Sequence, residues 1–173
     1  MIFLRHPVTE APEGLCYGRM DIGLGADAPA QIVAALEICP KAHAITSSPA
    51  LRCRLLAEAL ANHMSASLSF DDRLWEMNFG EWEGLTWSEV PRSQSDPWAA
   101  DVWNTAPPGG ETFAKVCERV ENALSDVAQD TLVVAHGGVI RAARIVLAGA
   151  RPCDVWDERI PFATPIRVAR MVS

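Results

Sequence analysis

Short apolar runs recur along the chain, and each is bounded by polar, glycine or proline residues. The runs at 2–5, 44–46, 66–70 and 131–135 are short for helices and predict strands, and a last strand is predicted over 166–172. Runs that are apolar almost throughout are typical of strands buried in a largely parallel sheet.

Apolar residues at helical spacing lie between these runs. Ile32, Ala35, Leu36 and Cys39 predict one helix, which Pro40 ends. Further helices are predicted over about 49–60, 111–127 and 139–148. Because strands and helices alternate, the pattern indicates an α/β fold, a three-layer α-β-α sandwich around a mostly parallel sheet.

Two segments lack this periodicity. Residues 7–27 are rich in Pro and Gly and predict a loop. Residues 71–110 hold five of the six tryptophans, with Pro and Gly between them. We expect this segment to be an insertion of loops and short helices within a single domain that spans 1–173, because 173 residues suit one domain.

Composition narrows the class of protein. The net charge of −7 argues against a general nucleic-acid surface, which needs a basic face. No apolar run approaches the ~18 residues of a membrane span, and Arg5 interrupts the N-terminus before any signal-like segment. The five cysteines form no CxxC pair, so we expect reduced thiols and a cytoplasmic protein. The histidines lack metal-ligand spacing, so no metal or cofactor is expected.

Polar residues follow three of the predicted strands. The first strand ends in Arg5 and His6, the second leads into Ser47, Ser48 and Pro49, and the fourth leads into His136, Gly137 and Gly138. In an open α/β sheet, ligands bind beyond the carboxyl ends of the strands, so these side chains are expected to lie together.

This group of residues suits a compact dianion such as phosphate. Arg52 lies one turn into the helix for which Ser48 is the expected N-cap and Pro49 the first residue. Arginine holds phosphate oxygens bidentately, and helix N-termini favour anions. Gly137 would let a ligand approach the backbone closely. Pro7 keeps His6 extended, which directs the imidazole out of the strand end.

Four motifs in order resemble the histidine phosphatase superfamily, in its phosphoglycerate-mutase-like branch. They are Arg5-His6, Ser48-Pro49-Ala50-Leu51-Arg52, the pair Leu74-Trp75-Glu76 and Phe79-Gly80-Glu81-Trp82-Glu83-Gly84, and His136-Gly137-Gly138. The resemblance spans the chain from Ile2 to at least Arg141 and implies a phosphoglycerate-mutase-like fold.

The resemblance also implies roles for individual residues. His6 would be the nucleophile and become phosphorylated, and Glu76 would protonate the leaving alcohol and then activate water. Arg5, Arg52 and His136 would neutralise the transferred phosphoryl group without a metal ion. Thr9 would touch phosphate. The chain departs from the family pattern at Pro7, where the motif has glycine, and at Pro12, where many members have asparagine.

Within the family, "CYGRMDIGL", "RLWEMNFGEWEGLTW" and "PGGETF" most resemble the α-ribazole phosphatases of cobalamin assembly. The resemblance therefore implies a metal-independent phosphomonoesterase acting on a small phosphorylated metabolite, with α-ribazole 5'-phosphate as the leading substrate. A broad sugar-phosphate or nucleotide phosphatase, a phosphoglycerate mutase and a non-catalytic phosphate-binding protein stay open as alternatives. No nucleic-acid or membrane partner is expected, and a homodimer is left open.

Other residues compete for some of these roles. Arg54 rivals Arg52, and Glu81 and Glu83 lie close to Glu76 in the sequence. His43 and Cys53 have simpler interpretations as surface and packing residues respectively. The tryptophans of 71–110 fit a core better than a substrate platform.

Overall fold

A computed structural model describes residues 1–171. The strands are β1 (Ile2–Arg5), β2 (Ala44–Ser47), β3 (Ser67–Phe70), β4 (Leu132–Ala135) and β5 (Pro165–Arg167). They form one sheet in the order β3-β2-β4-β1-β5, in which β5 alone is antiparallel. The predicted last strand ends at Arg167, earlier than expected, and Val172 lies outside the described residues.

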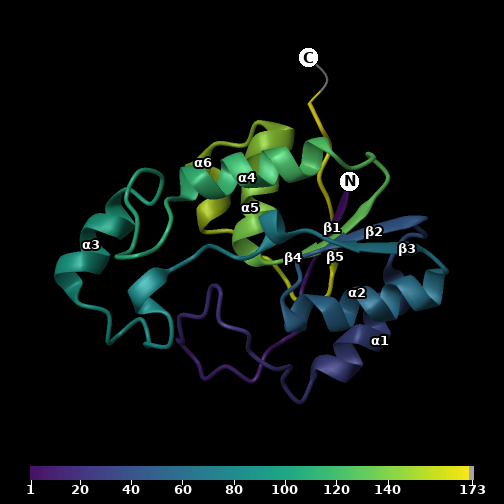
Figure 1. The fold of residues 1–173 in the computed structure, drawn as a ribbon, viewed down its shortest axis with the longest axis horizontal. Helices are drawn as coiled ribbons and strands as arrows, with labels where there is room; N and C mark the ends of the chain where they lie inside the picture. Colours follow the sequence, from purple (N-terminus) through teal and green to yellow (C-terminus); the bar gives the residue numbers. More distant parts are fainter. Residues whose placement is uncertain (172–173) are drawn as a thin grey trace.

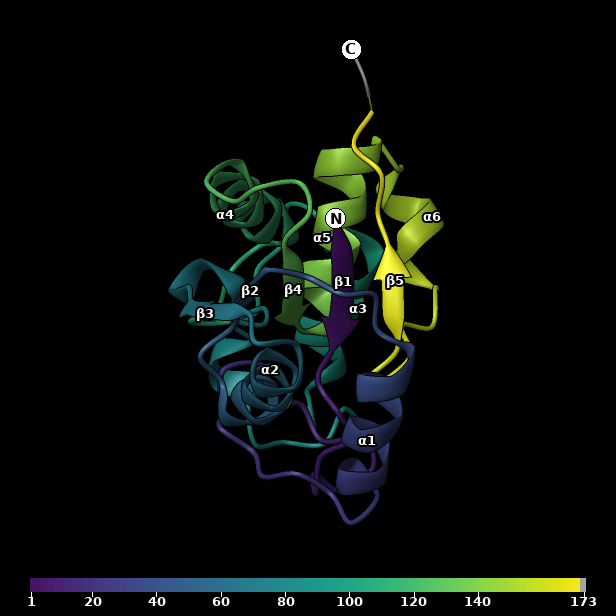
Figure 2. The same cartoon turned by 90° about the vertical axis from the view of Figure 1, so that its right-hand side faces the viewer.

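Helices cover both faces of the sheet, so the α/β prediction is confirmed. Figure 2 shows α1 (Ala28–Ile38) and α2 (Leu51–Met64) on one side, with α4 (Phe113–Ser125), α5 (Gly137–Ala148) and α6 (Pro152–Trp156) on the other. A buried core lies in each of the two layers between sheet and helices, the first around Leu56 and Leu60 of α2 and the second around Val116 and Val120 of α4.

The segment 71–110 lies beyond one end of the sheet (Figure 1). It contains the short 3₁₀ turns Asp72–Leu74 and Gly80–Trp82 and the helix α3 (Arg92–Ala100). Trp82 is buried in a small cluster with Cys16 and Val90, which joins this segment to the early loop.

Parallel pairing fixes where the functional strand ends lie. Arg5 is in register with Ala135, and Ser47 is in register with Val134. The hydrogen bonds continue one residue further, because His6 N donates to Ala135 O and Ser48 N donates to Val134 O, each at 2.9 Å. The residues that follow β1, β2 and β4 therefore meet at one edge of the sheet.

Helix α2 begins later than the sequence suggested. Its first residue is Leu51, and its N-cap residue is Ala50, which makes no side-chain cap. The prediction that Ser48 caps this helix is wrong, because Ser48 lies two residues before the cap and its Oγ lies 2.8 Å from Nε2 of His136. No helix in the described part of the chain is long and apolar enough to cross a membrane.

Candidate active site

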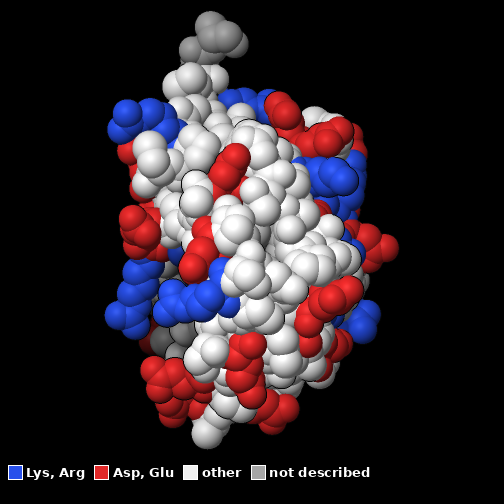
Figure 3. All heavy atoms as spheres, turned by 90° about the vertical axis from the view of Figure 1, so that its left-hand side faces the viewer, with Lys and Arg blue, Asp and Glu red and all other residues white. Residues whose placement is uncertain are grey.

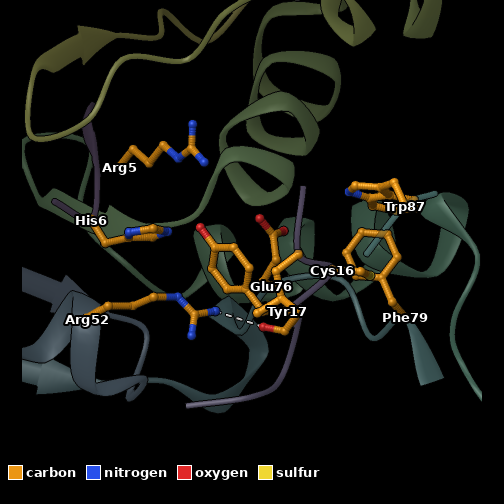
Figure 4. A pocket seen from close by; sticks show the side chains of 10 residues that line it. Arg5, His6, Cys16, Tyr17, Arg52, Glu76, Phe79 and Trp87 are labelled. Carbon is orange, nitrogen blue, oxygen red and sulfur yellow. Dashed lines mark hydrogen bonds between the residues drawn. The ribbon is translucent and has the colours of Figure 1, made fainter. Parts of the chain in front are cut away.

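His6 lines one end of a cavity at the carboxyl end of β1. The ring is almost fully buried and lies between the side chains of Arg5 and Arg52, while Glu76 faces it from the segment 71–110 (Figure 4). Its Nδ1 lies 2.7 Å from the carbonyl oxygen of Pro7. A carbonyl oxygen only accepts, so Nδ1 carries the proton and Nε2 keeps its lone pair.

Burial controls the protonation of His6. Loss of solvent lowers the pKa of His6 to about 3, and the positive charges of Arg52 and Arg5 add to this against the opposing effect of the Pro7 carbonyl. The imidazole is therefore neutral near pH 7. A neutral ring with one unprotonated nitrogen is the form that can attack phosphorus.

His136 lies directly behind His6 but does not line the cavity. The two ring centroids are 5.3 Å apart, and His136 is fully buried with its ring parallel to that of Trp75. Burial, followed by the charge of Arg52, holds the pKa of His136 well below its usual range. His136 is therefore a neutral ring and does not supply the positive charge that was expected of it. The hydroxyl group of Ser48 positions this ring.

The two arginines are held by backbone carbonyls and still have capacity for a ligand. Arg52 is fully buried and donates from Nη1 to Met20 O at 2.7 Å and from Nη2 to Gly18 O at 2.8 Å. Arg5 donates to Ile160 O at 3.0 Å. Nε of each arginine is buried without a partner in the described residues, so each guanidinium can donate further hydrogen bonds.

The structure distinguishes Arg52 from Arg54 as the arginine that faces the cavity. Arg52 lines the cavity. Arg54 points away, with Nε 3.3 Å from Glu58 and its guanidinium over the ring of Phe70. The burial of the two side chains differs accordingly, since Arg52 is inaccessible to solvent and Arg54 is exposed.

Glu76 meets the start of α5. Its Oε2 accepts a hydrogen bond from Gly138 N at 3.1 Å, and its Oε1 accepts one from Met77 N at 2.9 Å. A Cβ atom at position 138 would overlap Glu76 Oε1. The space that Gly138 leaves at this helix N-terminus is therefore filled by the chain's own carboxylate.

Gly137 and Thr9 lie outside the lining of the cavity. A Cβ at position 137 would lie 3.2 Å from Nη1 of Arg141, so the glycine makes room for this guanidinium. Thr9 lies behind Tyr17 and donates from Oγ1 to its hydroxyl at 3.3 Å. The roles of both residues as phosphate ligands stay predictions.

Glu83 fastens the early loop rather than serving as a second acid. Its carboxylate accepts hydrogen bonds from the backbone N–H groups of Arg19, Met20 and Phe79, at 2.8 to 3.0 Å. Glu81 is exposed to solvent. Glu76 is the only one of these three glutamates that lines the cavity.

Sequence reasoning missed Arg119, which holds the backbone around Glu76. From α4 it donates to the carbonyl oxygens of Arg73 and Trp75 at 2.6 Å and of Glu76 at 3.1 Å. Its guanidinium also pairs with Glu111, whose Oε1 accepts from Asn78 N at 2.8 Å. The only sequence signal is its place at the edge of the apolar stripe of α4.

Comparisons with known proteins show what the whole chain is similar to. The model of the histidine phosphatase superfamily (branch 1) matches residues 1–170. A glucosyl-3-phosphoglycerate phosphatase of Mycolicibacterium vanbaalenii is 33% identical, over 90% of this chain and 76% of the relative. Phosphoserine phosphatase 1 of Hydrogenobacter thermophilus is 28% identical, over 91% of this chain and 80% of the relative.

Solved structures extend the likeness. A mycobacterial glucosyl-3-phosphoglycerate phosphatase superposes with a TM-score of 0.78 at 26% identity, covering 90% of this chain and 82% of that one. The α-ribazole phosphatase of Shigella flexneri superposes with a TM-score of 0.86, covering 98% of this chain and 95% of that one. At 21% identity, the latter shows likeness of fold alone.

Proposed function

Because the chain belongs to branch 1 of the histidine phosphatase superfamily and is a phosphatase, we propose that it hydrolyses phosphate monoesters through a phosphohistidine on His6. The observation that carries this proposal is the hydrogen bond between His6 Nδ1 and Pro7 O. It leaves the lone pair on Nε2 of a neutral ring between two arginines.

The first step transfers the phosphoryl group. Nε2 of His6 forms a bond to phosphorus while the bond from phosphorus to the ester oxygen breaks. Arg5 and Arg52 neutralise the equatorial oxygens, which supplies the electrostatic part of the catalysis. Glu76, in its protonated form, gives its proton to the departing alkoxide.

The second step releases phosphate. Glu76, now a carboxylate, accepts a proton from water as the water oxygen attacks phosphorus, and the bond from phosphorus to Nε2 breaks. The enzyme returns to its starting state with a neutral His6 and a protonated Glu76. His136 supports both steps as a neutral partner behind the nucleophile, held by Ser48.

The leading substrate is α-ribazole 5'-phosphate. Three segments of the sequence, "CYGRMDIGL", "RLWEMNFGEWEGLTW" and "PGGETF", resemble the α-ribazole phosphatases. The relatives of higher identity are named for glucosyl-3-phosphoglycerate and phosphoserine, so esters of these two kinds are the comparison substrates.

The first test is hydrolysis of p-nitrophenyl phosphate in EDTA by the wild type and His6→Ala. We expect turnover that EDTA leaves intact and that falls at least ~10³-fold in His6→Ala, as for removal of other covalent nucleophiles. His43→Ala, at an exposed histidine outside the cavity, is the matched control and should retain activity. Full activity in His6→Ala would show that another group is the nucleophile.

A further inference from the structure

The cavity at His6 changes character along its length. Its inner end carries the two cations, Arg5 and Arg52, on either side of the nucleophile. Its outer end, away from the arginines in Figure 4, is walled by Phe79 and Trp87. Leu15 and Cys16 also line the cavity, and Tyr17 lies beside Arg52, whose guanidinium carbon is 5.3 Å from the centre of the tyrosine ring. A phosphate bound at His6 would therefore direct its alcohol group past Glu76 and toward an aromatic wall.

The aromatic wall is held in place by other rings. Trp87 meets Phe79 edge to face, with centroids 5.4 Å apart, and lies nearly parallel to Trp98 at 5.6 Å. Trp82 packs against both Trp87 and Trp98 from the buried side. Its indole N–H donates to Gln94 Oε1 at 2.9 Å. Packing of this kind prearranges a flat surface, because aromatic pairs have preferred geometries.

Trp87 is nevertheless exposed. The residue is 41% accessible although its ring touches three other aromatic rings. A large exposed aromatic group that is fixed by its neighbours and lines a cavity is poised to be covered by a ligand. The prediction that the tryptophans form a core holds for Trp82, whereas Trp87 presents its ring to the cavity.

The outer wall offers no cation to an acidic alcohol group. Among the described residues that line the cavity, Arg5 and Arg52 at the inner end are the only ones of the Lys and Arg types. Arg19, next to the lining residue Gly18, has its guanidinium 3.6 Å from the carboxylate of Glu111. Figure 3 shows the face that carries α3 with a broad uncharged area, around which Asp and Glu alternate with Lys and Arg. A carboxylate on the alcohol group would meet Glu76 there instead of an unpaired cation.

The volume of the cavity limits how much of the ligand it can enclose. The cavity measures about 150 Å³. Sites that enclose drug-sized ligands measure roughly 300–1,000 Å³. The enclosed space therefore suits the phosphate and the atoms next to it, and the rest of the alcohol would lie at the mouth, where Trp87 is exposed.

We propose that the substrate is the monophosphate of an alcohol that carries a neutral, planar aromatic group, which stacks on Trp87 and Phe79. This inference rests on the proposed function, since it names the alcohol that the phosphatase releases. Aryl and heteroaromatic alcohols belong to the class, whereas phosphoserine and phosphoglycerates, which carry a carboxylate, do not. Trp87 sets specificity and takes no part in the chemical steps.

The test compares two alkyl esters of similar size that differ in planarity, benzyl phosphate and cyclohexylmethyl phosphate, with O-phosphoserine as the charged ester. We expect the wild type to show a kcat/KM for benzyl phosphate at least ~5-fold above that for cyclohexylmethyl phosphate, the size of one aromatic pair. O-phosphoserine should be the poorest of the three esters.

Substitutions at Trp87 assign the preference to its ring. Trp87→Leu should bring the benzyl to cyclohexylmethyl ratio close to one, while Trp87→Phe, which keeps a ring, should retain most of it. The matched control is Trp103→Leu, because Trp103 belongs to the same segment and packs on Phe113 outside the cavity. This control should keep the wild-type ratio.

The possible results distinguish a failure of the aromatic-alcohol inference from a failure of the proposed function. A ratio near one in the wild type, or a preference for O-phosphoserine, overturns the aromatic-alcohol inference while His6-dependent turnover leaves the proposed function in place. A wild-type ratio that survives in Trp87→Leu likewise overturns the role of Trp87. Absence of turnover with all three esters, with p-nitrophenyl phosphate and with α-ribazole 5'-phosphate overturns the proposed function, and the inference with it.

Discussion

The two ends of the cavity are built in different ways. At the phosphate end, the side chains follow directly from strands whose register is fixed by the ladder, such as Arg5 opposite Ala135. At the alcohol end, Glu76, Phe79 and Trp87 come from a segment in which loops join short helical turns. That segment is held by side chains reaching to its backbone, as Arg119 and Glu83 do.

This difference separates chemistry from specificity. The backbone of His6 is held by the sheet through the hydrogen bond from His6 N to Ala135 O, so the position of the nucleophile is insensitive to changes in nearby loops. Loops tolerate substitution and insertion, and they carry most of the variation in binding sites. We therefore expect substitutions at the phosphate end to abolish turnover of every ester, and those at the alcohol end to change the ranking of esters.

Arg52→Ala should have the largest effect. It removes a buried guanidinium that faces the cavity and leaves the Gly18 and Met20 carbonyls without their donors. We expect kcat/KM to fall by ~10³-fold for all esters, at the upper end of what loss of one preorganised donor costs. Steady-state kinetics with p-nitrophenyl phosphate and benzyl phosphate measure it, with unfolding midpoints recorded alongside.

Arg54→Ala is the control for Arg52→Ala. Arg54 is exposed and pairs with Glu58, so its loss should leave kcat/KM within about twofold of the wild type. If the effects of the two substitutions were reversed, the phosphate end would not be organised around Arg52.

Glu76→Gln should have a smaller effect that depends on the alcohol. An alkyl alcohol needs a proton as it departs, so kcat for benzyl phosphate should fall by ~10²-fold. p-Nitrophenolate is a far better leaving group and should depart with little loss of rate in the first step. Single-turnover measurements with both esters separate the two steps, and Glu81→Gln, at an exposed glutamate, should behave like the wild type.

An equal loss for both esters in the first step would contradict the role of Glu76 as an acid. Such a result would indicate that Glu76 acts only by fastening the start of α5 through Gly138 N.

The smallest predicted effect is on stability and distinguishes the buried histidine from an exposed one. The pKa of His6 is lowered to about 3, so between pH 6.5 and 3 the unfolded chain binds a proton that the folded chain does not. The free energy of unfolding should therefore decrease as the pH is lowered through this window, by up to about 1.4 kcal/mol per pH unit from this group. Above pH 6.5 the contribution is constant.

Urea unfolding at pH 7 and pH 5 measures this dependence. His6→Gln should reduce the loss of stability between the two pH values, whereas His43→Gln should leave it unchanged because His43 is exposed. A wild type as stable at pH 5 as at pH 7 would show that His6 is not buried in its neutral form.

Much of the fold follows from the sequence because its signals are local. Strand β1 occupies the predicted residues 2–5, and the helix predicted over 111–127 is observed as Phe113–Ser125. Hydrophobic periodicity reports burial directly, so buried strands and the amphipathic helix α4 are visible in it. Helix α6 was missed because five residues are too few to show a period.

The candidate site divides in the same way. Residues at strand ends could be predicted, because parallel strands place their carboxyl ends at one edge. Ser48 was misassigned as a cap, since its partner His136 is 88 residues away and local spacing gives no sign of it. Arg119 and the carbonyl of Ile160 were missed for the same reason, because contacts across the tertiary structure decide their roles.

Pro7 shows that the residue after His6 need supply only its backbone carbonyl oxygen to orient the nucleophile. The family pattern has glycine at this position, yet the structure uses only the carbonyl oxygen, which proline also has. The N–H that proline lacks plays no part in orienting the nucleophile. A search for relatives that demanded glycine after the histidine would pass over this chain, although the atom that fixes the tautomer is in place. In this phosphatase, position 7 is defined by an atom that every amino acid supplies.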